Sequence, residues 1–145
     1  MPKTSTMPDD PMAVVARLLD ATNAHNVVAL TSCFAADYVN ITPAHPSRSF
    51  TGREQVNANW KQLFASIPDL RASITNSAIG GGVVWSEWIM TGTRYDGSSH
   101  EMAGVILFTV TDGEIAKAKF YLEPVERQSG TVSDNIRLQA NGATS

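Results

Sequence analysis

The sequence predicts an α+β domain in which three N-terminal helices pack on a curved, mainly antiparallel sheet, forming a cone with an internal pocket. Apolar residues recur at helical spacing up to residue 67 and then alternate with polar residues from residue 70 to residue 122. Helices that precede the strands, rather than alternating with them, are typical of this class. Because 43% of the 145 residues are hydrophobic and 17% are charged, a disordered chain is excluded. We expect one domain over residues 10–125, with flexible tails at 1–9 and 126–145.

Two helices open the domain. Asp10 can cap the first, and Pro11 suits its first position, where the missing N–H would have no helical partner. Asn26 can cap the second helix, whose apolar face then holds Val27, Leu30 and Phe34. A short strand over residues 37–42 follows, because polar and apolar residues alternate there.

The third helix has the clearest start signal. Thr51-Gly52-Arg53-Glu54 fits a capping box, in which the Thr hydroxyl and the Glu carboxylate each satisfy a free backbone N–H. Pro68 ends this helix. Its apolar stripe consists of Val56, Trp60, Leu63 and Ile67.

Four strands complete the domain as an antiparallel meander, at residues 70–75, 83–93, 101–111 and 115–122. Gly80-Gly81-Gly82 and Asp96-Gly97 form the first two turns. Asp112-Gly113 predicts a tight hairpin, because both turn residues must adopt positive φ. Pro124 ends the last strand.

Composition limits the possible partners. A formal net charge of -3 disfavours nucleic acid, and no apolar run reaches the roughly 20 residues of a membrane-spanning helix. The first ten residues have no apolar core that would suit a signal peptide, so a cytoplasmic location is expected. Cys33 is the single cysteine and is expected in the core, and His25 is expected at the surface. No two histidines have metal-ligand spacing, so no metal is predicted.

The order of elements resembles the nuclear transport factor 2-like superfamily, which includes SnoaL-like polyketide cyclases, ketosteroid isomerases and limonene-epoxide hydrolases. The resemblance covers about residues 12–123. It implies a hydrophobic small-molecule ligand, no cofactor and a homodimer formed through the sheet. Lys117, Lys119 and Tyr121 share the face of the last strand that would make this contact. The segments that carry the resemblance are residues 34–40, 51–54, 67–70, 88–93, 112–115 and 120–121.

The catalytic residues of these relatives do not transfer intact. The ketosteroid isomerase Tyr and Asp positions hold Leu18 and Thr42. The positions of the limonene-epoxide hydrolase triad hold Glu87, Ile89 and Phe120. SnoaL-like cyclases often carry a His where this chain has Ile41, and their acidic residue near the last strand's end corresponds to Glu123.

Glu87 is the leading candidate for general acid–base catalysis. If Trp85, Glu87 and Ile89 face the pocket, the carboxyl group is partly desolvated, and its pKa rises toward neutrality. We expect this orientation, although Trp88 makes the opposite face equally apolar. In the alternative, Glu87 faces solvent or pairs with Arg71 or Arg94 across the sheet.

Polar groups on the first strand and two histidines complete the candidate site. Tyr38, Asn40 and Thr42 share one face of that strand and could orient a substrate carbonyl or hydroxyl, unless the face is a solvent-exposed edge. His45 and His100 are placed near the pocket mouth, where either could move a proton, although a surface role is the alternative. The residues expected to contact a ligand are Leu18, Trp60, Phe64, Trp85 and Phe120.

Two functions are therefore open from the sequence. The first is a cofactor-free isomerase, cyclase or dehydratase acting on a polyketide-, terpene- or steroid-like molecule. The second is a non-catalytic binder of such a molecule, or a dimerisation module.

Overall fold

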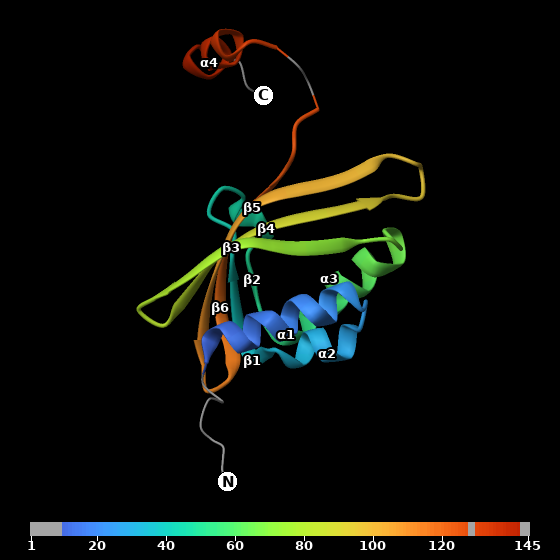
Figure 1. Cartoon of the computed structure of the whole chain (residues 1–145), viewed down its shortest axis with the longest axis vertical. Coiled ribbons are helices and arrows are strands. Elements are labelled where there is room, and N and C mark those ends of the chain that lie inside the picture. The colour runs from blue at the N-terminus through green and yellow to red at the C-terminus, as the bar shows by residue number, and fades with distance from the viewer. Residues whose placement is uncertain (1–9, 128–129, 143–145) are drawn as a thin grey trace.

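The computed structural model describes residues 10–127 and 130–142, and it confirms the α+β class (Figure 1). Six strands form one sheet in the order β2-β1-β6-β5-β4-β3. The helices are α1 (Pro11–Asn23), α2 (Val27–Ser32), α3 (Arg53–Ser66) and α4 (Val132–Ala140), with a 3-10 turn η2 (Pro46–Arg48). The strands are β1 (Phe34–Ile41), β2 (Phe50–Thr51), β3 (Arg71–Gly80), β4 (Val83–Thr93), β5 (Ser99–Thr111) and β6 (Glu114–Pro124).

The sheet is antiparallel except where β1 pairs in parallel with β6. The predicted meander β3–β6 is confirmed, and Figure 1 shows α1, α2 and α3 together at one side of it. Asp112 and Gly113 both have positive φ (53° and 77°), as the tight hairpin requires. The core lies between the helices and the inner face of the sheet, and includes Val14, Leu30, Trp88, Ile106 and Phe108.

Two of the three predicted helix starts are confirmed. Asp10 accepts a hydrogen bond from the Met12 N–H (3.0 Å), and Asn26 accepts one from the Ala29 N–H (3.0 Å). The predicted capping box is wrong. Thr51 pairs with Val39 as part of β2, and Gly52 caps α3 at a φ of 102° without a side-chain hydrogen bond. The sheet therefore uses the residue that the helix would have used as its cap.

The first strand begins earlier than predicted. Phe34, expected on the second helix, is the first residue of β1 and pairs with Ile115 of β6. The Ile115 N–H also donates to the Cys33 carbonyl (2.8 Å). Pairing with β6, about 80 residues later in the chain, decides where β1 begins. The spacing of apolar residues near Phe34 does not predict this boundary.

The predicted orientation of β4 is also wrong. Ser86 and Trp88 face the core, each 1% exposed, whereas Trp85 is 50% exposed and Glu87 is exposed beside it. The Trp88 Nε1–H donates to Ser86 Oγ (2.8 Å), and Ser86 Oγ donates to the Ile106 carbonyl (2.8 Å). Because both polar groups are satisfied inside, burial of Trp88 costs no hydrogen bond.

Strands β5 and β6 approach closely at Gly104. This residue has a φ of +153°, and a Cβ added there would lie 2.8 Å from the Leu122 Cα and collide with the Tyr121 carbonyl oxygen. Only glycine fits this position, because a side chain would force the two strands apart.

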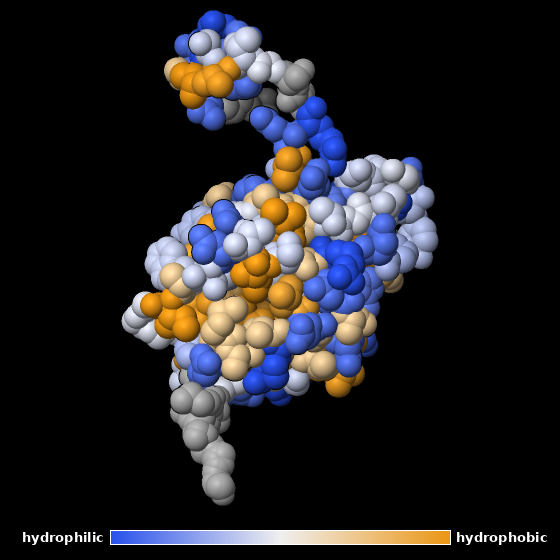
Figure 2. Space-filling view, in the orientation of Figure 1, coloured by the Kyte–Doolittle hydropathy of each residue, from blue (hydrophilic) through white to orange (hydrophobic). Residues whose placement is uncertain are grey.

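The C-terminal segment, predicted to be a flexible tail, contains helix α4, which Thr131 caps by accepting from the Asp134 N–H (3.0 Å). Its Val132, Ile136 and Leu138 are exposed, and Figure 2 shows this apolar surface away from the body of the domain. The predicted tail at residues 1–9 lies outside the described residues. In the described part of the chain, no helix has the length and apolar character to cross a membrane.

Candidate functional site

A cavity of about 390 Å³ lies between α3 and the inner face of the sheet. Most of its wall is apolar, and among the described residues that line it there is no Asp or Glu. The polar part of the wall comes from β1, η2, α3 and the start of β5. The lining residues are Phe34, Tyr38, Asn40, Thr42, Arg48, Phe50, Val56, Asn59, Trp60, Leu63, Met90, His100, Met102, Phe120 and Leu122.

The inner face of β1 carries a chain of hydrogen bonds. The Tyr38 hydroxyl donates to Asn40 Oδ1 (2.7 Å), and Asn40 Nδ2 donates to Thr42 Oγ1 (3.3 Å). All three residues are buried, so the predicted inward orientation of this face is confirmed. The Thr42 hydroxyl, which accepts from Asn40, keeps its own proton to donate into the cavity.

Burial fixes the protonation of Tyr38. Desolvation raises the pKa of its phenol far above the usual value near 10, so the hydroxyl stays protonated at any physiological pH. Tyr38 therefore acts as a hydrogen-bond donor to Asn40 and does not serve as a base.

His100, at the start of β5, also lines the cavity. Burial, and then the charge of Arg94, lower the pKa of its imidazole below the ordinary value. Arg94 Nη2 lies 3.3 Å from His100 Nδ1 and can only donate, so Nδ1 is the acceptor and Nε2 carries the proton. His100 is thus a neutral donor whose basic lone pair is already engaged.

The cavity opens toward a groove that shares Asn59, Leu63 and His100 with it. Arg94 and Asp96 also line this groove, at the turn between β4 and β5. Asp96 Oδ1 accepts from both the N–H and the hydroxyl of Ser98 (2.9 and 2.6 Å), so that oxygen is occupied within the turn.

The segment between β1 and β2 carries Arg48 into the cavity wall. The Thr42 N–H donates to Ser49 Oγ (3.0 Å), which holds the two ends of the segment together. His45 Nε2 lies 2.9 Å from Glu123 Oε1 and ties the segment to the end of β6. His45 does not line the cavity, whereas His100 does.

The structure brings together only some of the predicted ligand contacts. Trp60 and Phe120 line the cavity. Leu18 lies deeper, against a separate space of about 20 Å³, and Phe64 stacks on His25 with ring centroids 4.4 Å apart. Trp85 is on the outer face of the sheet, so its predicted contact is wrong.

Glu87, the predicted acid–base residue, is also on the outer face. Its Oε1 accepts from the Thr75 hydroxyl (2.8 Å), and neither of the predicted arginine partners contacts it. The assignment failed because Trp85 and Trp88 are equally apolar, and alternation alone does not show which face is buried.

Several lining residues were missed from the sequence. Met90 follows from the alternation of β4 once the correct face is chosen. Asn59 is adjacent to the predicted apolar stripe of α3, and Arg48 is in an irregular loop with no periodic signal. Only the tertiary fold brings these two side chains to the same cavity.

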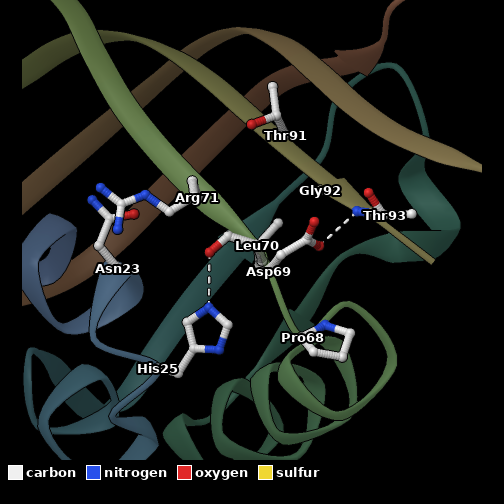
Figure 3. Close-up of a pocket in the computed structure, with 9 residues that line it drawn as sticks. All are labelled: Asn23, His25, Pro68, Asp69, Leu70, Arg71, Thr91, Gly92 and Thr93. Atoms are coloured by element: carbon white, nitrogen blue, oxygen red, sulfur yellow. Dashed lines mark hydrogen bonds between the residues drawn. The ribbon is translucent and has the colours of Figure 1, made fainter. Parts of the chain in front are cut away.

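A second recess lies at the corner between α1 and α2 (Figure 3). His25, with a φ of 55°, points at the Leu70 carbonyl, to which its Nε2–H donates (2.8 Å). Asn23 donates to the Ala72 carbonyl (2.9 Å) and accepts from the Ala72 N–H (2.7 Å). These side chains hold β3 to the helices, so His25, which was expected at the surface, is partly buried in this recess and has a structural role.

Cys33 is buried, as predicted, and desolvation raises the pKa of its thiol. A thiol held in this protonated form is a poor nucleophile. In the described ranges, no three His, Cys, Asp or Glu side chains are grouped so that they could hold a metal ion.

Solved structures share this fold at low sequence identity. A hypothetical protein from Catenulispora acidiphila, with a ketosteroid isomerase-like fold, is 24% identical, covers 74% of this chain and 84% of its own, and has a TM-score of 0.65. A protein from Jannaschia sp. CCS1, provisionally described as a SnoaL-like polyketide cyclase, is 20% identical, covers 85% and 92%, and has a TM-score of 0.68. IdmH from Streptomyces antibioticus, provisionally a polyketide cyclase, is 21% identical, covers 92% and 99%, and has a TM-score of 0.66.

A family assignment comes from the sequence itself. No curated protein gives a significant match. The SnoaL-like domain, in contrast, matches residues 15–118, which include most of α1, the cavity-lining part of β1, α3 and most of the meander. The chain therefore belongs to the SnoaL-like domain family.

Proposed function

We propose that this protein binds an apolar small molecule that carries a carbonyl or hydroxyl oxygen, of a polyketide-, terpene- or steroid-like kind. The observation that carries the proposal is the hydrogen-bond chain on β1, which ends at a Thr42 hydroxyl in a mostly apolar cavity. Apolar cavities with a few convergent polar groups are the usual form of small-molecule sites. The polar groups fix the orientation of the ligand, and the apolar wall supplies most of its affinity.

The donors of the cavity support this assignment. Thr42 has a hydroxyl proton, Asn40 has a second amide proton, and His100 has the proton on Nε2. A ligand oxygen accepts hydrogen bonds from such groups, and each adds about 1 kcal/mol to the net free energy of binding.

A cofactor-free isomerase, cyclase or dehydratase is the second candidate. The same donors would stabilise the negative charge of an enolate oxygen, which favours this candidate. The described cavity wall has no carboxylate, however, and the His100 lone pair is engaged by Arg94, so a base for proton abstraction is missing. We therefore place binding ahead of turnover.

A second copy of the chain is the proposed protein partner. On the outer face of the sheet, residues of β4, β5 and β6 lie opposite one another in two rows. One row is Trp85, Leu107 and Lys119, and the other is Glu87, Val105 and Tyr121. This face combines exposed Trp85, Ile89 and Tyr121 with charges of both signs. Because Glu87 and Lys119 lie on the same face, two copies related by a two-fold axis could pair their opposite charges, so the face is suited to pair with itself.

Isothermal titration calorimetry with a matched pair of ligands tests the binding proposal. 2-Acetonaphthone and 2-ethylnaphthalene have the same ring, but only the first has an oxygen. We expect the ketone to bind about fivefold more tightly, which corresponds to roughly 1 kcal/mol, and Thr42→Val to remove that preference. Native mass spectrometry of the purified protein, followed by organic extraction, would identify the natural ligand.

Two tryptophans provide the control. Trp60→Ala, in the cavity wall, should lower the affinity for both ligands. Trp85→Ala, on the outer face of the sheet, should leave both affinities unchanged. Equal losses in the two variants would place binding outside the cavity and reject the proposal. If the protein catalyses the exchange of a ketone's α-protons for deuterium in deuterated water, the second candidate is favoured.

A further inference from the structure

The charges around the cavity differ in sign from those of the whole protein. The chain has a formal net charge of -3, yet Arg48 is the charged side chain among the described lining residues, and no acid accompanies it. His100 contributes no charge at neutral pH, because its pKa is lowered. A ligand that enters the cavity therefore meets one positive charge that is not compensated by a neighbouring carboxylate.

Arg48 has no acidic partner in the described structure. The ion pairs found among those residues are His45–Glu123, Arg127–Glu101 and Arg137–Asp134. Arg48 is exposed where it lines the cavity, and without a carboxylate paired to it the guanidinium is available to pair with a charge on a ligand.

The segment that carries Arg48 is joined to the residue at the end of the β1 hydrogen-bond chain. Thr42 and Ser49, which follows Arg48 in the sequence, are joined by the 3.0 Å bond from the Thr42 N–H to Ser49 Oγ. Arg48 and Thr42 also line the same cavity, with Asn40 beside them. A guanidinium, a hydroxyl and a primary amide, all hydrogen-bond donors, thus line the same cavity.

The segment that carries Arg48 is held in place from several sides. The Arg48 N–H donates to the His45 carbonyl (2.9 Å), and the Ser49 N–H donates to the Pro46 carbonyl (3.0 Å). His45 is in turn tied to Glu123 at the end of β6. The backbone that carries the Arg48 side chain is therefore held in place before a ligand arrives, which lowers the entropic cost of binding.

We propose that Arg48, Thr42 and Asn40 form a subsite for the carboxylate of an apolar monocarboxylic acid, whose body fills the cavity. The inference rests on the proposed function, and it specifies the polar group of the ligand. A carboxylate accepts several hydrogen bonds and pairs with a guanidinium through two parallel ones. One arginine matches one negative charge, and a phosphate, with nearly two charges at neutral pH, would leave charge unpaired in an apolar site.

The test uses 1-naphthylacetate and 2-(1-naphthyl)ethanol, which share a ring system and differ in the charged group. On the wild-type protein, calorimetry should give an affinity about tenfold higher for the acid than for the alcohol. This comparison needs no variant. Arg48→Gln should reduce the affinity for the acid about tenfold and change that for the alcohol less than about twofold.

Arg71→Gln is the matched control. It removes the same charge from an exposed position on β3, outside the cavity wall, and should change the affinity for the acid less than about threefold. Circular dichroism checks that both variants are folded. If both arginine variants lower the affinity for the acid equally, the positive charge acts over a long range and not at one subsite, and the subsite is rejected.

The remaining outcomes separate this inference from the proposed function. If acid and alcohol bind the wild-type protein equally and Arg48→Gln changes neither, the cavity is a binding site but not one for carboxylates. If neither compound binds, nor the neutral naphthalene ligands, the proposed function fails and the subsite with it.

Discussion

At the scale of single residues, the protonation state of His100 depends on its surroundings. Burial is the main cause that lowers the pKa of its imidazole, and the positive charge of Arg94 is the second. Asp96, in the same groove, has its pKa lowered first by hydrogen bonds from Ser98 and remains ionised. His100 is therefore neutral in the folded protein over a range of pH in which the unfolded chain already begins to take up a proton.

This difference predicts how stability depends on pH. Below pH 6.5, the ordinary pKa of histidine, the imidazole of residue 100 takes up a proton in the unfolded chain, whereas it is still neutral in the folded protein. The contribution of His100 to stability is complete above that pH and is lost as the pH falls through the lowered folded value. We expect urea denaturation from pH 7 to pH 5 to show a steeper loss for the wild type than for His100→Gln. Parallel curves would contradict the lowered pKa.

At the scale of the elements, the contact between β5 and β6 at Gly104 constrains the sheet most strongly. Gly104 pairs with Trp88 on one side and with Leu122 on the other. Leu122 lines the cavity and Trp88 belongs to the core, so a displacement at Gly104 would reach both. The close approach of the two strands thus supports the shape of the binding site.

Gly104→Ala should accordingly destabilise the fold. We expect the free energy of unfolding to fall by about 1–3 kcal/mol, because the added methyl group collides with β6 backbone and the φ suits only glycine. Chemical denaturation measures the change. Gly80→Ala is the control, since a Cβ there meets nothing within 4 Å, and it should change stability by less than about 0.5 kcal/mol. An equal effect of the two substitutions would show that the contact at Gly104 is not tight.

Elements with strong local signals could be predicted from the sequence. The caps at Asp10 and Asn26 and the turn at Asp112-Gly113 use chemistry that acts within a few residues. The start of β1 and the cap of α3 could not, because strand pairing decides both: β1 begins where it meets β6, and Thr51 pairs with β1 instead of capping the helix. In the site, the polar face of β1 follows from alternation, whereas Arg48 and Asn59 reach the cavity only through tertiary packing.

At the scale of the whole molecule, the outer face of the sheet is the largest feature left without a role in the monomer. Trp85, Ile89 and Tyr121 are 50%, 39% and 44% exposed on it. Exposed aromatic residues that are grouped in this way usually mark an interaction surface. The cavity is on the other face, so a dimer formed here would leave the ligand entrance open.

The proposed dimer predicts a change of mass in solution. Light scattering at micromolar concentration should give twice the monomer mass of 15.6 kDa for the wild type, and the monomer mass for Trp85→Glu. The introduced charge should not unfold the protein, because Trp85 is not part of the core. Val28→Glu, at a position 77% exposed on α2, should remain a dimer. A monomeric wild type would reject the sheet-mediated dimer.

The two hydrogen bonds of Asn23 have a consequence for how the protein behaves at high concentration. Strand β3 is at the edge of the sheet, and Ala72 is one of its first residues. By taking both the N–H and the carbonyl of Ala72, the Asn23 side chain occupies the positions that an invading chain would use to extend the sheet. Helix α1 thus closes part of a free edge, and its loss would expose a template for aggregation.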